Sequence, residues 1–101
     1  RDFTKANELY LKAGELGCAE GYCKLGYSYR VGRGVEIDKE KAKYYCELAA
    51  MNGNVKARHN LGFVEVEAGN EQRAMKHFII AAKAGFKPSL DAANGGFMSG
   101  Y

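Results

Sequence analysis

The stretch KAKYYCELAAMNG, Lys41 to Gly53, has two further copies in the chain, and this repetition decides the fold. It aligns without a gap with KANELYLKAGELG, Lys5 to Gly17, and with RAMKHFIIAAKAG, Arg73 to Gly85. Each copy ends in glycine, and the copies are spaced by 36 and then 32 residues. Periods in the thirties are typical of stacked helix pairs, because one unit cannot bury its apolar face alone.

Within each copy, apolar side chains recur at the spacing of one helix face. These positions are Ala6, Leu9, Tyr10, Ala13; Ala42, Tyr45, Cys46, Ala49; and Ala74, His77, Phe78, Ala81. We expect the copies to form the outer helix of each pair, and the segments starting near Cys18, Asn54 and Lys87 to form the inner helices. Residues able to cap first turns precede several of these helices, namely Asp2, Asp38, Asn54 and Asn70.

The sequence therefore predicts an all-α fold, a solenoid of about six antiparallel helices in a single domain of 101 residues. We expect a half-repeat over residues 1–17, a full repeat over 18–53 and a shortened repeat over 54–85. A degenerate terminal helix is expected over 86–101. Its glycines and asparagine oppose helix propagation.

Small residues at matched positions predict close packing. Gly26 and Gly62 fall inside the inner helices, where glycine costs about 1 kcal/mol relative to alanine, so we expect a neighbouring helix to approach there. Further residues are given a structural role because they are small or capping residues at repeat positions: Gly32, Gly34, Asp38, Ala42, Gly53, Ala74 and Gly85.

The stretch YRVGRGVEID, Tyr29 to Asp38, raises the possibility of a phosphate-binding loop. A dinucleotide-binding loop needs a third glycine, which would fall at Ile37, and a preceding strand where this chain predicts a helix. Asp38 would also compete with an anion for the amides of the next helix. The two glycines are therefore interpreted as a turn between helices.

Composition names no partner. The net charge is +3, from 15 basic and 12 acidic residues, without a long block of like charge, so neither nucleic acid nor membrane is predicted as a partner. An odd number of cysteines, Cys18, Cys23 and Cys46, favours a reducing, intracellular setting. With no apolar membrane span or signal-peptide core, the sequence predicts a soluble, cytoplasmic protein, unless a targeting segment was removed.

No catalytic, metal or cofactor site is predicted. The possible soft-metal ligands, Cys18, Cys23, Cys46, His59 and His77, lack the spacing of a zinc site. Nucleophilic catalysis needs a nucleophile with a nearby base and an orienting group, and no such trio is indicated. The sequence thus favours a protein that is not an enzyme.

One unit carries a specific family pattern: Gly17, Ala19, Leu25, Gly26, Tyr29, Gly32, Gly34, Val35, Asp38, Lys41, Ala42, Tyr45, Ala49, Ala50 and Gly53. In these residues the chain resembles the Sel-1-like repeat family. The resemblance implies a right-handed superhelix related to tetratricopeptide arrays, a scaffold role in protein complexes, and no catalytic residues. The shortened unit departs from the pattern by losing four residues between its helices.

The inner helices carry equivalent stripes at helical spacing: Glu20, Lys24, Tyr27, Val31 and Lys56, Asn60, Phe63, Glu67. Aromatic rings beside hydrogen-bonding groups suit a concave peptide groove. The predicted partner-binding residues are Lys24, Tyr27, Lys56, Asn60 and Phe63. In the alternative interpretation, Tyr27 and Phe63 fill the seam between repeats and Asn60 bonds a loop carbonyl.

Two other functions stay open at this point. The exposed ends of the array would pair in a homodimer or extend a longer superhelix. An RNA-binding helical repeat of the pentatricopeptide sort is the third class, but the modest charge and the Sel-1-like glycines speak against it.

Overall fold

The computed structural model describes residues 2–87. They form α1 (Phe3–Glu15), α2 (Ala19–Val31), α3 (Lys39–Met51), α4 (Val55–Glu67) and α5 (Glu71–Lys83). No strand occurs among the described residues, so the all-α prediction is confirmed. The sixth helix predicted over residues 86–101 lies outside the described residues except for its first two positions. Within residues 2–87, no helix combines the length and apolar character needed to cross a membrane.

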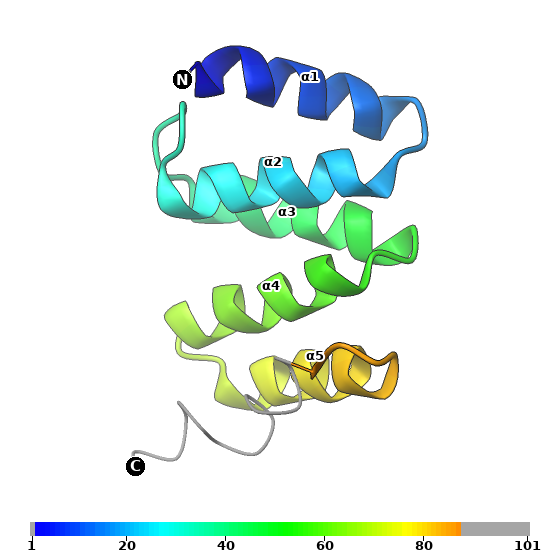
Figure 1. The fold of residues 1–101 in the computed structure, drawn as a ribbon. Helices are drawn as coiled ribbons and strands as arrows, with labels where there is room; N and C mark the ends of the chain where they lie inside the picture. The colour runs from blue at the N-terminus through cyan, green and yellow to red at the C-terminus, as the bar shows by residue number, and fades with distance from the viewer. Residues whose placement is uncertain (1, 88–101) are drawn as a thin grey trace.

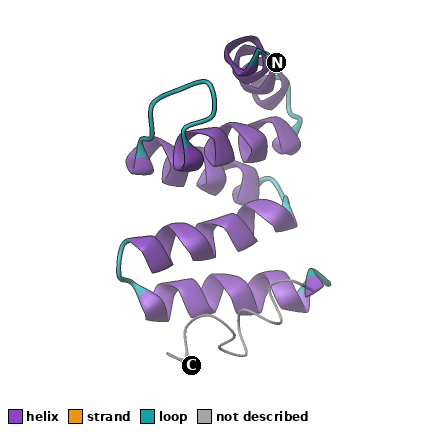
Figure 2. Ribbon diagram, turned by 60° about the vertical axis from the view of Figure 1, so that its left-hand side comes forward, coloured by secondary structure: helices purple, strands orange, loops and turns teal. Residues whose placement is uncertain are grey.

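The helices follow one another in chain order from α1 to α5, with α3 partly behind α2 in Figure 1, and each runs antiparallel to the one before. Consecutive helices pack on each other, and α2 also contacts α4. The turned view in Figure 2 shows the same succession from α1 to α5. This neighbour-on-neighbour packing is the architecture of an α-solenoid, and α2 and α4 are the inner helices of the prediction.

Three of the four expected caps begin their helices as predicted. Carboxylate or amide oxygens of Asp2, Asp38 and Asn54 accept the backbone N–H three residues on, at 3.2, 3.0 and 2.8 Å. Asn70 precedes α5 but makes no such bond. Its Nδ2 instead donates to Oε1 of Glu65 at 3.0 Å. The expectation for Asn70 was wrong. Leaving the buried Glu65 carboxylate without a hydrogen bond would cost more free energy than leaving the first turn of α5 without a side-chain cap.

Two glycines let an outer helix approach the inner helix before it. A Cβ built at Gly26 would lie 2.6 Å from Sγ of Cys46 and 3.1 Å from the carbonyl oxygen of Ala42. At the equivalent position of the next repeat, an added Cβ on Gly62 would lie 2.5 Å from Cζ of Phe78. Cys46 and Phe78 are both 0% exposed. The absence of a side chain at each glycine therefore leaves the space that one buried side chain of the next helix fills.

The matched core positions are buried differently in α1 than in the other outer helices. Alanines at two of these positions are almost wholly inaccessible in α3 and α5: Ala42, Ala49, Ala74 and Ala81. Their equivalents in α1, Ala6 and Ala13, are only half-buried, and so is Tyr10. Leu9, expected on the packed face, is 64% exposed. One side of α1 thus lacks the covering that α3 and α5 have.

The loop between α2 and α3 folds back onto the start of α1. Gly32 and Gly34 adopt φ values of 80° and 76°, in the left-handed region that favours glycine. A Cβ on Gly34 would lie 2.7 Å from Phe3. Nδ2 of Asn7 donates to the carbonyl oxygen of Arg33 at 2.8 Å. The loop is a tightly fitted turn that fixes the backbone of Arg33 against α1.

Candidate functional site

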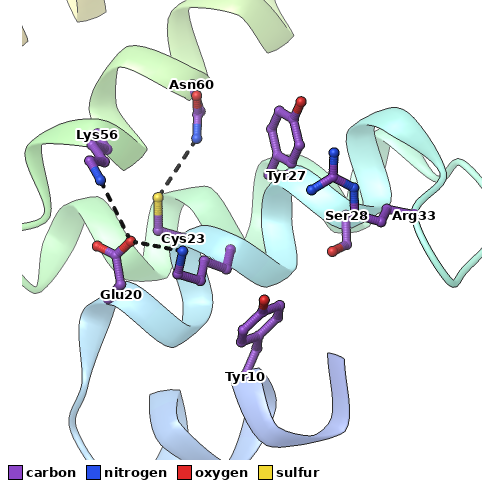
Figure 3. Close-up of a pocket in the computed structure, with 9 residues that line it drawn as sticks. Tyr10, Glu20, Cys23, Tyr27, Ser28, Arg33, Lys56 and Asn60 are labelled. Carbon is purple, nitrogen blue, oxygen red and sulfur yellow. Dashed lines mark hydrogen bonds and ion pairs between the residues drawn. The ribbon is translucent and has the colours of Figure 1, made fainter. Parts of the chain in front are cut away.

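A cavity of about 250 Å³ opens between α1, α2 and α4 (Figure 3). Its walls come from three helices and the α2–α3 loop: Tyr10, Glu20, Cys23, Lys24, Tyr27, Ser28, Arg33, Lys56 and Asn60. Four of the five predicted binding residues, all but Phe63, lie in this lining. We call this hollow the inner groove.

Glu20 is the polar centre of the inner groove (Figure 3). Its Oε2 lies 3.7 Å from Nζ of Lys24 and 3.9 Å from Nζ of Lys56. Its Oε1 accepts a hydrogen bond of 3.0 Å from Nδ2 of Asn54. Since Oδ1 of Asn54 caps α4, a single carboxylate connects α2 to the start of the next inner helix.

Tyr27 lies between two guanidinium groups. The Cζ atoms of Arg30 and Arg33 are each 5.2 Å from the centre of its ring. Arg30 also lies 5.6 Å from the ring centre of Phe63 and forms an ion pair of 3.5 Å with Glu67. The cations therefore hold the Tyr27 ring in place at the edge of the inner groove.

Phe63, at the repeat position equivalent to Tyr27, has a different environment. It is half-buried and packs with Ala74 and Phe78 in a core cluster between α4 and α5. Its ring meets that of Phe78 edge-on, with centres 5.3 Å apart. The structure thus places Tyr27 at the inner groove and Phe63 in the seam between helices.

Within residues 2–87, Asn60 forms no hydrogen bond to a loop carbonyl, which differs from the alternative interpretation of the sequence. Its Nδ2 makes a weak hydrogen bond of 3.7 Å to Sγ of Cys23. The two side chains come from consecutive repeats and meet in the inner groove. The Cys23 sulfur is the acceptor, where a loop carbonyl oxygen was the alternative expectation.

The two buried cysteines, Cys23 and Cys46, are poor nucleophiles in this fold. Burial raises the pKa of the Cys23 thiol from 9.0 to about 11, and that of Cys46 to about 12. Both thiols therefore stay protonated near neutral pH. No group of three or more His, Cys, Asp or Glu side chains in the described part of the chain could hold a metal ion.

The two histidines belong to packed regions. His59 lies among the rings of Phe63, Phe78 and Phe86, and its pKa is lowered first by burial and then by Arg30. Nδ1 of His77 lies 3.4 Å from Nη1 of Arg58. Burial, followed by that arginine, lowers the pKa of His77 as well.

The residues of the lining that were not among the predicted partner-binding residues are Tyr10, Glu20, Cys23, Ser28 and Arg33. Tyr10 was assigned to the core on the evidence of its repeat position. Arg33 lies in a loop that is four residues shorter in the second repeat, and the alignment places Gly69, which has no side chain, opposite it. Its position directly after a glycine in a long loop was the available signal, because such loops commonly carry functional side chains.

The sequence matches the family model described as Sel1 repeat at residues 1–18, 19–54 and 56–86. The chain belongs to the Sel1 repeat family. A crystal structure of a Sel1 repeat protein from Oxalobacter formigenes matches with a TM-score of 0.79 and 25% identity. That match covers 90% of this chain and 39% of the other.

Two curated relatives match shorter stretches of the Sel1 repeats. A sel1-like repeat-containing protein of Acanthamoeba polyphaga mimivirus is 32% identical over 62 residues, or 61% of this chain. An uncharacterized protein of Neisseria meningitidis serogroup B is 36% identical over 56 residues, or 55% of this chain. The matched stretch is 12% of each relative's length. Sel1 repeats are generally helical modules for protein interaction, built on a non-catalytic scaffold.

Proposed function

We propose that the inner groove holds a peptide or a segment of a partner protein, which makes this chain a non-catalytic interaction scaffold. One observation carries the proposal. The groove is lined at equivalent positions of consecutive repeats, Lys24 with Asn60 and Glu20 with Lys56. An extended ligand that crosses several repeats would meet side chains at such a regular spacing.

The chemistry of the lining suits a peptide. Tyr27 offers an aromatic edge, and Lys24 and Lys56 offer charged donors. Among the described residues, Asn60 uses only its Nδ2, in one weak bond to sulfur. Its Oδ1 can therefore accept a peptide N–H. Aromatic anchors beside amide and charged groups are the composition of peptide-binding hot spots.

The test compares peptide binding by the wild type and a double variant, Tyr27→Ala with Asn60→Ala. Peptides enriched from a random displayed library on the wild type should bind the double variant about tenfold more weakly, a loss of about 1.4 kcal/mol that is typical of interface residues with a measurable contribution. Tyr44→Ala is the matched control, because Tyr44 is a 56% exposed tyrosine outside the groove. Equal affinity for wild type and double variant, with helical content unchanged, would exclude this face.

A second candidate function rests on α1. Because Ala6, Tyr10 and Ala13 are less buried than their equivalents in α3 and α5, we propose that this face packs against a helix of another Sel1 repeat, supplied by a second copy of the chain. Leu9, 64% exposed, would lie at the centre of that contact.

Light scattering over a range of concentrations tests this association. The mass should rise with concentration for the wild type and stay that of one chain for Leu9→Lys. Met51→Lys is the control, because Met51 is a 78% exposed apolar side chain on α3. A wild type that remains monomeric at high concentration would contradict self-association.

A further inference from the structure

The charges of the inner groove are unbalanced. Three cationic side chains line it, Lys24 from α2, Lys56 from α4 and Arg33 from the α2–α3 loop. Glu20 is the only carboxylate among the described residues of the lining. The three cations come from separate elements and do not lie along one helix face: Lys24 and Lys56 lie beside Glu20, and Arg33 lies beside Tyr27. Such a site attracts an anionic group and repels a cationic one.

Glu20 leaves much of this positive charge available. Its distances to the two lysine Nζ atoms, 3.7 and 3.9 Å, exceed the roughly 2.7–2.9 Å of charge-assisted hydrogen bonds. The side chains of Lys24 and Lys56 are 50% and 62% exposed. Each ammonium group therefore keeps donors for a ligand, while Asn54 holds the carboxylate of Glu20 in place at 3.0 Å.

On these grounds, and resting on the proposed function, we propose that the inner groove is selective for acidic segments of a partner protein. An aspartate or glutamate side chain of the ligand would enter between Lys24 and Lys56, and Arg33 would attract the same segment farther along the groove. Asn60 would accept a backbone N–H of the same segment through its Oδ1. The ligand carboxylate shares the lysines with Glu20, which is thus a built-in competitor for the same donors.

The size of the hollow favours a side chain over a larger ligand. Its volume of about 250 Å³ is below the roughly 300–1,000 Å³ of pockets that enclose small-molecule ligands. Single-stranded RNA is less well matched, because binding of bases needs open aromatic faces for stacking. The guanidinium groups of Arg30 and Arg33 each lie 5.2 Å from the centre of the Tyr27 ring and compete with a base for stacking on it.

The experiment begins with a random peptide library displayed on phage and selected on the whole chain. Peptides enriched on the wild type should contain an excess of aspartate and glutamate over the unselected library. A synthetic enriched peptide, its amide version with Asn and Gln, and a single-stranded RNA oligonucleotide are then titrated by fluorescence anisotropy. The acidic peptide should bind most tightly and weaken as salt rises, because the ion pairs are partly exposed.

Variants distinguish the effect of the groove lysines on binding from the effect of the net charge of the chain. Lys24→Gln with Lys56→Gln should weaken the acidic peptide about tenfold, the upper range for two partly exposed ion pairs. Lys39→Gln with Lys76→Gln removes the same charge from exposed sites outside the groove and should have little effect. Glu20→Gln can still accept from Asn54 but no longer competes, so it should tighten binding several-fold.

The outcomes distinguish the two proposals. If enriched peptides bind the groove but show no acidic excess, or if Glu20→Gln weakens binding, the acidic selectivity is wrong and the scaffold proposal stands. Tighter binding of the RNA than of any peptide overturns the choice of ligand class. If no peptide of any composition binds, both proposals fail.

Discussion

Replacing Gly62 with alanine adds one methyl group to the contact between α4 and α5. On an open helix surface, this change would stabilise the helix by about 1 kcal/mol. At Gly62 the new Cβ would lie 2.5 Å from Cζ and 2.7 Å from Cδ1 of Phe78. These separations are about 1 Å shorter than an optimal contact between carbon atoms. The new methyl group would therefore clash with the Phe78 ring.

The magnitude follows from two opposing effects. Phe78 is 0% exposed and packs in a cluster with Ala74, Phe63 and Val66, so its ring moves only by displacing them. Overpacking of this kind costs about 1–3 kcal/mol. After the gain in helix propensity, we expect Gly62→Ala to lower the free energy of unfolding by about 1 kcal/mol. For a domain of this size, the melting temperature should fall by roughly 4–8 °C.

Urea unfolding followed by circular dichroism measures the effect, with Phe78→Leu as the partner in a double-mutant cycle. Phe78→Leu alone leaves a cavity and should destabilise the chain. In that background, Gly62→Ala should cost less, giving a coupling energy of about 1 kcal/mol between residues in contact. If Gly62→Ala stabilises the protein, or has the same effect in both backgrounds, the explanation of the glycine by close packing is refuted.

Further predictions concern the cap of α4 and the titratable groups. Asn54→Ala should lower the free energy of unfolding by about 1–2 kcal/mol in urea unfolding, and Asn54→Ser, which restores the cap only, should recover part of it. In the native state at neutral pH, mass spectrometry should find one rapidly alkylated thiol, the exposed Cys18, and all three only after unfolding. Because burial raises the pKa values of Cys23 and Cys46, the unfolded chain loses these protons first, so stability should fall as pH rises above about 9. Both histidines have lowered pKa values, so the unfolded chain gains protons first and thermal stability should also fall as pH drops below about 6.5.

The fold could be predicted from sequence because its determinants are local and repeated. Asp38 and Asn54 precede their helices, and each side chain accepts the backbone N–H of the residue three positions on. The alignment of Gly26 with Gly62 pointed to close helix contacts before any partner side chain was known. Repetition gave two of these signals twice, since Asp38 repeats Asp2 and Gly62 repeats Gly26.

The groove was harder to predict than the fold. Its chemistry depends on contacts between helices and on residues that differ from one repeat to the next. Glu20 appeared in the stripe, but its link to Asn54 spans two helices and depends on how the repeats stack. Phe63 aligned with Tyr27 and was expected at the same surface. The large Phe78 ring next to Gly62 changed the packing there, where the first repeat has the smaller Cys46. Features shared by the repeats can be predicted by aligning them. The effects of differences between the repeats can be found only from the three-dimensional structure.

The position of Glu20 links ligand binding to the cooperativity of the array. In repeat proteins, stability is approximately the sum of the stabilities of single repeats and the energies of their interfaces. Glu20 contributes to one such interface through Asn54 and Lys56, and the same carboxylate lines the groove. Any ligand that changes the contacts of this carboxylate changes a nearest-neighbour energy. Occupation of one groove would then alter how far local unfolding spreads from one repeat to the next.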